Sequence, residues 1–134
     1  MLRRLKLKTK KNGLVEISHQ VKETVSNSGV LTGLCVVSIP HTTAGLTITS
    51  YRDPKGHEDI HDEYNRLIPT RIDFKHREDT PQDAAGHVKS TIAGATLSLI
   101  IEDSQLMLGH SQGLFFVEFD GPRNREYFVK ILQG

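Results

Sequence analysis

The sequence predicts an α+β fold, with a mostly antiparallel β-sheet or sandwich core and a few interspersed helices, in a single domain over residues 1–134. The length of 134 residues suits one compact domain with its own core. Strand-like segments outnumber helical ones, and the helices do not alternate regularly with them. Hydrophobic content of 37% and charged content of 25% are typical of globular proteins and argue against disorder.

The first elements follow from local patterns. Residues 2–9 alternate apolar and basic side chains, which predicts a half-buried strand, and the Asn-Gly pair at 12–13 marks a turn. Ser18 suits the N-cap of a helix in which valines recur at helical spacing, and Gly29 is placed to end it. Residues 31–39, rich in valine and leucine, predict a buried strand.

The middle of the chain predicts one strand and two helices. Residues 46–49 predict a strand, and the Asp-Pro pair at 53–54 begins a helix that Pro69 ends. Residues 74–82 are polar and have no periodicity, whereas residues 84–93 predict a short helix. Four further strands complete the prediction, the first two joined as a hairpin: 96–101, 106–108, 114–119 and 127–132.

Charge and composition exclude several classes of partner. Seventeen basic and sixteen acidic residues leave a net charge of +1, which gives no overall attraction to nucleic acid or to an anionic membrane. Basic residues do crowd the N-terminus, where we interpret them as protection of an edge strand; nucleic-acid binding there would depend steeply on salt. The N-terminus has no apolar signal segment, so we expect a cytoplasmic protein.

The pentapeptide HEDIH, His57 to His61, matches the helical motif of zinc proteases. Two histidines four residues apart lie on one helix face, with Glu58 beside the first. The motif lies in the first turns of a short helix, however, and the chain is small for a protease cleft. The next histidine, His76, lies beyond the proline that ends the helix. We therefore interpret HEDIH as an accidental match on a surface helix.

Three other histidines lie in or near predicted loops. His41 follows a buried strand, His76 lies in the irregular polar stretch, and His87 lies in a short helix near Asp83. For each histidine alone, a structural role is favoured. Three in such positions favour a shared site, because imidazoles and a carboxylate suit zinc or a similar divalent ion, with one position open.

Cys35 and Arg123 each have a structural and a functional interpretation. If the strand at 31–39 continues to His41, the Cys35 thiol and the His41 ring share one face of it. We favour a core position for Cys35, because a nucleophile or metal ligand needs an accessible, electropositive setting. As the only cysteine, Cys35 forms no internal disulfide. Arg123 follows an Asp-Gly-Pro turn and either faces solvent or binds an anion, because guanidinium matches phosphate geometry.

Taken together and in order, several segments resemble the YjbQ family of secondary thiamine-phosphate synthase enzymes, over nearly the whole chain. The matching segments are Cys35, HTTAGLTI (41–48), RLIP (66–69), His76, DAAGHVKS (83–90), LGHSQG (108–113) and EFDGPR (118–123). Three departures concern the pocket. Where the family has LGTWQ this chain has His110 and Ser111, and where the family often has an acidic residue after HTTAGLTI it has Thr-Ser-Tyr at 49–51. Its NADAH-like stretch is Asp-Ala-Ala-Gly-His at 83–87. The family pattern does not include HEDIH.

The resemblance implies a small α+β homotrimer with a histidine-rich site that holds a divalent metal such as zinc. The metal ligands it implies are His41, His76 and His87. The catalytic residues it implies are His41, His87, Cys35 and Asp120, and the substrate-binding residues are Gln112 and Arg123. Three functions stay open. The first is thiamine-phosphate synthesis, which joins a pyrimidine diphosphate to a thiazole phosphate and releases pyrophosphate. The second is metal-dependent hydrolysis of a small phosphorylated or acyl substrate, and the third is non-catalytic binding by a trimer.

Overall fold

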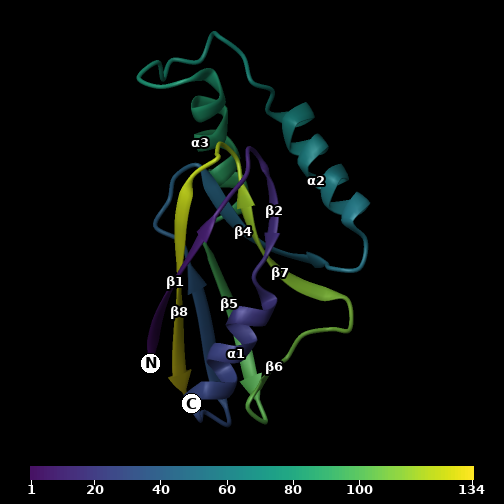
Figure 1. Cartoon of the computed structure of the whole chain (residues 1–134), viewed down its shortest axis with the longest axis vertical. Helices are drawn as coiled ribbons and strands as arrows, with labels where there is room; N and C mark the ends of the chain where they lie inside the picture. Colours follow the sequence, from purple (N-terminus) through teal and green to yellow (C-terminus); the bar gives the residue numbers. More distant parts are fainter.

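Two antiparallel sheets and three helices make up the fold, in a computed structural model that describes residues 1–134 (Figure 1). The strands are β1 (Leu2–Lys8), β2 (Gly13–Glu16), β3 (Gly33–Ser38), β4 (Ala44–Ser50), β5 (Thr96–Glu102), β6 (Gln105–Leu106), β7 (Gln112–Glu118) and β8 (Asn124–Gln133). The helices are α1 (Ser18–Ser28), α2 (Pro54–Leu67) and α3 (Pro81–Ala93). One sheet has the order β1-β8-β3-β5-β6 and the other β2-β7-β4. The predicted α+β class with antiparallel sheets is confirmed.

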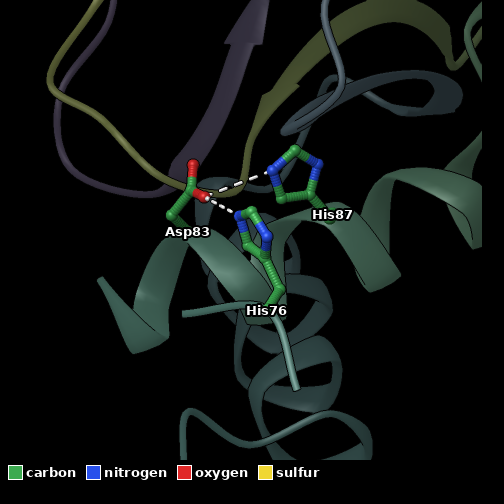
Figure 2. Close-up of side chains that lie close together, drawn as sticks. All are labelled: His76, Asp83 and His87. Atoms are coloured by element: carbon green, nitrogen blue, oxygen red, sulfur yellow. Dashed lines mark hydrogen bonds and ion pairs between the residues drawn. The ribbon is translucent and has the colours of Figure 1, made fainter. Parts of the chain in front are cut away.

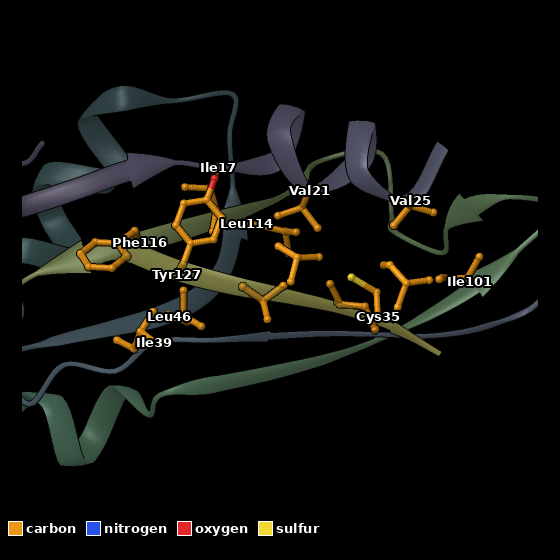
Figure 3. Packing of buried hydrophobic residues seen from close by; sticks show 14 of the residues in the cluster. Ile17, Val21, Val25, Cys35, Ile39, Leu46, Ile101, Leu114, Phe116 and Tyr127 are labelled. Carbon is orange, nitrogen blue, oxygen red and sulfur yellow. The ribbon is translucent and has the colours of Figure 1, made fainter. Parts of the chain in front are cut away.

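The core lies against one face of the five-stranded sheet. Alternate residues of β3, β5 and β8 point to that face, as the period of two in a strand requires. The three-stranded sheet and α1 cover it: Leu46 and Phe116 come from the smaller sheet, and Val21 and Val25 from the helix (Figure 3). Cys35 is one of the buried core residues beneath α1.

Several helix ends match the predictions, and two differ for local reasons. Gly29 ends α1 with φ 73°, the left-handed conformation that favours glycine. Ser18 does not cap α1; its hydroxyl donates to Glu16 and accepts from a β7 amide, so it ties the helix to the sheet. Helix α3 begins at Pro81, earlier than predicted, because the Thr80 hydroxyl accepts a capping hydrogen bond from the Asp83 amide.

Helix α2 packs on the outer face of the smaller sheet. The Tyr64 ring lies 4.8 Å from that of Phe119, measured between ring centroids. The buried Lys89 of α3 donates to the Asn65 side chain at 2.6 Å and so joins the two helices. No helix combines the length and the apolar character that a membrane crossing requires.

A buried ion pair joins the two sheets. Arg125 of β8 donates through Nε and Nη2 to the Glu118 carboxylate of β7, the Nε bond being 2.8 Å long, and Nη2 also donates to the Thr43 hydroxyl at 2.9 Å. Glu118 accepts further bonds from the Thr9 hydroxyl and the Asp120 amide. Burial raises the pKa of Glu118, but these hydrogen bonds outweigh it and hold the pKa below its ordinary value.

We predict that Glu118→Gln lowers the free energy of unfolding by about 3–5 kcal/mol, because it leaves the Arg125 charge buried without its partner. Urea unfolding at neutral pH measures this. Glu63→Gln is the matched control, since Glu63 pairs with Arg66 on the surface and its loss should leave stability unchanged. An equal change in the free energy of unfolding in the two variants would show that the buried ion pair matters no more to stability than the exposed one.

Candidate functional site

The start of α3 places two ligating side chains on one face. Thr80 caps the helix and Pro81 occupies its first position. This start determines which later residues of α3 share one face. Asp83 and His87 are then four residues apart and lie one above the other. His76 reaches the same point from the loop before the helix, and Figure 2 shows the three side chains converging. We call His76, Asp83 and His87 the histidine–aspartate cluster.

The geometry of the histidine–aspartate cluster fits a divalent metal ion. The Nε2 atoms of His76 and His87 lie 3.1 and 3.2 Å from the same oxygen, Oδ2 of Asp83. Ligand atoms bonded to tetrahedral zinc at about 2.0 Å lie about 3.3 Å from one another. The Asp83 side chain is only 8% exposed, whereas the imidazoles are 41% and 39% exposed, so the cluster has a buried anchor and an open side.

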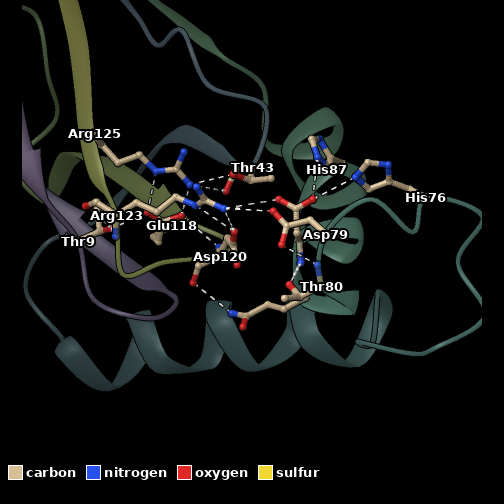
Figure 4. A network of polar contacts seen from close by, with 12 residues as sticks. Thr9, Thr43, His76, Asp79, Thr80, His87, Glu118, Asp120, Arg123 and Arg125 are labelled. Atoms are coloured by element: carbon tan, nitrogen blue, oxygen red, sulfur yellow. Dashed lines mark hydrogen bonds and ion pairs between the residues drawn. The ribbon is translucent and has the colours of Figure 1, made fainter.

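Arg123 backs the cluster with positive charge. Its Nε and Nη2 donate to Oδ2 of Asp120 at 3.0 and 2.6 Å, which fixes the plane of the guanidinium (Figure 4). Nη2 also lies 3.8 Å from Oδ1 of Asp83, the oxygen that the imidazoles do not contact. Gln82 donates to the Asp120 carbonyl at 3.1 Å and so ties this turn to the first turn of α3.

The cluster opens into a hollow of about 440 Å³. Polar and charged side chains line it together with Pro40, and none of the lining residues is a large apolar one. Glu78 and Asp79 contribute carboxylates, and Arg125 reaches it from the buried ion pair. The site is therefore suited to a small polar molecule, and Arg123 is the group that could bind an anionic part of it.

His41 lines the same hollow but is not in the cluster. Its Nε2 lies 3.0 Å from the amide nitrogen and 3.1 Å from the carbonyl oxygen of Glu126, so the backbone of β8 holds the ring in place. Burial lowers the pKa of His41, and the charge of Arg125 lowers it further. The third member of the cluster is Asp83, whereas the sequence analysis groups His41 with His76 and His87.

The remaining predicted site residues lie in different places. Asp120 and Arg123 are beside the cluster, as described. Cys35 is fully buried in the core, where burial raises the pKa of its thiol to about 11, so it is neither accessible nor ionised near neutral pH. Gln112 lines another hollow, between α1 and the start of β7, and its Oε1 accepts from the Gly109 amide at 2.8 Å. The chain does not bring Cys35 and Gln112 to the cluster.

The HEDIH segment lies in the exposed helix α2. The Nε2 of His57 lies 2.6 Å from the Ser50 carbonyl, and its ring packs edge-on against Phe115. His61 Nε2 instead contacts the Asn65 amide at 3.1 Å. Neither belongs to the one group of three ligating side chains found in residues 1–134.

The sequence analysis notes Asp83 near His87 but does not name it among the candidate metal ligands. The available signal was its spacing from His87, since an aspartate and a histidine four apart share one face of a helix. The Thr-Pro pair at 80–81, a strong helix start, would have placed both residues inside the helix.

Comparison with known proteins shows the family of this chain. A family model described as "UPF0047 protein YjbQ-like" matches residues 3–134. The chain belongs to the YjbQ family. A UPF0047 protein of Methanocaldococcus jannaschii is 41% identical over 133 residues, which cover 98% of this chain and 94% of the relative. YugU of Bacillus subtilis is 34% identical over 134 residues, covering 98% and 99%.

Solved structures of the YjbQ family share the whole fold. A conserved YjbQ/UPF0047 protein of Clostridium acetobutylicum superposes with a TM-score of 0.92 at 40% identity, covering 97% of this chain and 99% of that one. A YbjQ-like protein of Sulfolobus solfataricus gives a TM-score of 0.94 at 28% identity, covering 100% and 97%. The two sheets and their helices are thus the architecture of the YjbQ family.

For this YjbQ-family chain we predict that His61 makes stability fall on acidification. Burial first, and the charge of Lys89 second, lower the pKa of folded His61 below its ordinary value of 6.5. The unfolded chain then binds the proton more readily, so the free energy of unfolding falls as pH drops through about 6.5 towards the lower folded pKa. Urea unfolding of metal-free protein between about pH 8 and pH 5 measures the slope.

His61→Gln should reduce that slope. His19→Gln is the control, because the His19 side chain is 86% exposed and its loss should leave the slope as it is. An identical slope in wild type and His61→Gln would contradict the prediction.

Proposed function

We propose that this YjbQ-family chain holds a divalent metal ion such as zinc at His76, Asp83 and His87 and hydrolyses a small phosphorylated substrate. One observation carries the proposal: two imidazole nitrogens lie 3.1 and 3.2 Å from one carboxylate oxygen, with all three atoms within 4.8 Å of one another, beside a guanidinium and an open polar hollow. When bound, such an ion polarises phosphoryl oxygens and lowers the pKa of water.

Arg123 is the residue that would bind the phosphoryl group. Its Nε and Nη2 are engaged by Asp120, whereas Nη1 has no protein partner and is free to donate. Because Asp120 already holds the Arg123 guanidinium in one orientation, the side chain loses little conformational freedom when an anion binds. Arg123 would therefore orient the substrate and stabilise charge on its oxygens.

Hydrolysis joins a water oxygen to phosphorus and breaks the bond between phosphorus and the ester oxygen. Glu78 would accept the proton of the water and return it to the leaving oxygen. Its carboxylate lines the hollow and has no ion-pair partner, whereas Asp79 lies 3.9 Å from Arg123. Glu78 is therefore the carboxylate we assign as the general base.

Thiamine-phosphate synthesis, which the resemblance implies, would use the same groups. Arg123 would hold the departing pyrophosphate, and the ion would neutralise its charge. No phenylalanine, tyrosine or tryptophan lines the hollow to cover the two heterocycles, so hydrolysis accounts better for its polar lining. Formation of thiamine phosphate from the two substrates, lost in His87→Ala, would instead support the synthase.

The homotrimer that the resemblance implies is also part of the proposal. The outer face of the five-stranded sheet has Leu34 in register with Ile100 and Leu132 on its two neighbours, all about half exposed. Such an apolar row suits contact between copies. Sedimentation at the mass of a single 15.0 kDa chain would contradict a trimer.

We predict that Asp83→Asn and His87→Ala each weaken zinc binding at least about 100-fold, because each removes or neutralises a ligand. Elemental analysis of tag-free protein measures this. His57→Ala is the control and should keep its metal. Retention of metal in His87→Ala, with loss in His57→Ala, would move the site to α2 and overturn the proposal.

Turnover of p-nitrophenyl phosphate provides the test of activity. We expect a chelator to abolish it and zinc to restore it, and we expect Arg123→Gln to lower kcat/KM about 100-fold with metal content unchanged. Stoichiometric zinc without turnover of any phosphoester would show that the chain is a binding protein instead.

A further inference from the structure

We propose that the substrate carries two anionic groups and that the second binds in a basic hollow beside the metal site. This inference rests on the proposed function, because the first group is the phosphoryl group at Arg123 and the ion. The second hollow measures about 610 Å³ and lies between β1, β8 and His41. His41 and Arg125 line both hollows, so the two are neighbours that share a wall.

Two lysines give the second hollow its charge. Lys6 and Lys8 lie two residues apart on β1, so both side chains point to the same face of the sheet. No carboxylate lies within 4.0 Å of either ammonium. Unpaired cations in a concavity attract an anion that can displace their water.

The other groups of the second hollow complete an anion site. Asn124 contributes a carboxamide that makes no hydrogen bond within the chain, and the His41 ring, held at Nε2 by the Glu126 backbone, lines the same hollow. Glu126 contributes one negative charge, and the Glu118 carboxylate balances that of Arg125. Glu126 lies opposite Lys6 in the register of β1 and β8, whereas Lys8 lies opposite Asn124. Two ammonium groups and one carboxylate leave the hollow a net positive charge.

The surroundings favour a small dianionic molecule over a nucleic acid. Lys6, Lys8 and Arg125 are the only lysines and arginines that line the second hollow, which are too few to neutralise a run of backbone phosphates. No phenylalanine, tyrosine or tryptophan lines either hollow, so the large aromatic surfaces on which successive bases stack are absent. A molecule that spans the shared wall would place one anionic group in each hollow.

Calorimetric titration of the zinc-loaded protein tests this with two probes, methylphosphonate and trimethylene bisphosphonate. We expect the bisphosphonate to bind at least about tenfold more tightly, since its second group binds intramolecularly once the first is bound. In Lys6→Gln/Lys8→Gln the two affinities should become equal. Lys10→Gln/Lys11→Gln removes the same charge from exposed residues outside the hollow and should keep the difference.

The outcomes separate this inference from the proposed function. Equal affinities for the two probes in the wild type would overturn the second site alone. Unchanged methylphosphonate binding in His87→Ala would overturn the proposed function. Tighter binding of a single-stranded DNA oligonucleotide than of the bisphosphonate, lost in Lys6→Gln/Lys8→Gln, would show that the lysines bind nucleic acid and would also overturn the inference.

Discussion

The buried ion pair between Arg125 and Glu118 is the interaction on which the rest of the structure depends. It joins β8 of one sheet to β7 of the other, and its remaining hydrogen bonds hold Thr9 and Thr43. Glu118 also accepts from the amide of Asp120, which fixes the start of the turn that carries Arg123. The same pair that holds the two sheets together thus sets one wall of the candidate site.

The site itself combines one rigid element with one turn. Helix α3 sets Asp83 and His87 by its cap, and the Asp120 carboxylate sets the Arg123 guanidinium. Helix α3 and the turn meet at the Asp83 carboxylate. Its Oδ2 lies next to the imidazoles, and its Oδ1 lies next to the Arg123 guanidinium. A buried carboxylate is costly without polar partners, and this arrangement provides imidazole nitrogens on one side and a guanidinium on the other.

Sequence patterns predicted much of the fold because they act locally. The alternation along β1, the glycine that ends α1 and the Asp-Pro start of α2 depend on neighbouring residues only. The site was predictable in part: His76 and His87 do meet. His41 binds the backbone of Glu126, 85 residues away, and Cys35 faces the core, and neither fact follows from local sequence. Asp83 was not named among the ligands although its helical spacing was visible.

The most direct test of the metal site is a crystal of the protein grown with zinc and measured at the zinc absorption edge. Our account predicts one strong anomalous peak per chain, about 2.0–2.2 Å from Nε2 of His76, Nε2 of His87 and Oδ2 of Asp83. A peak at His57 and His61, or none near Asp83 at saturating zinc, would contradict it.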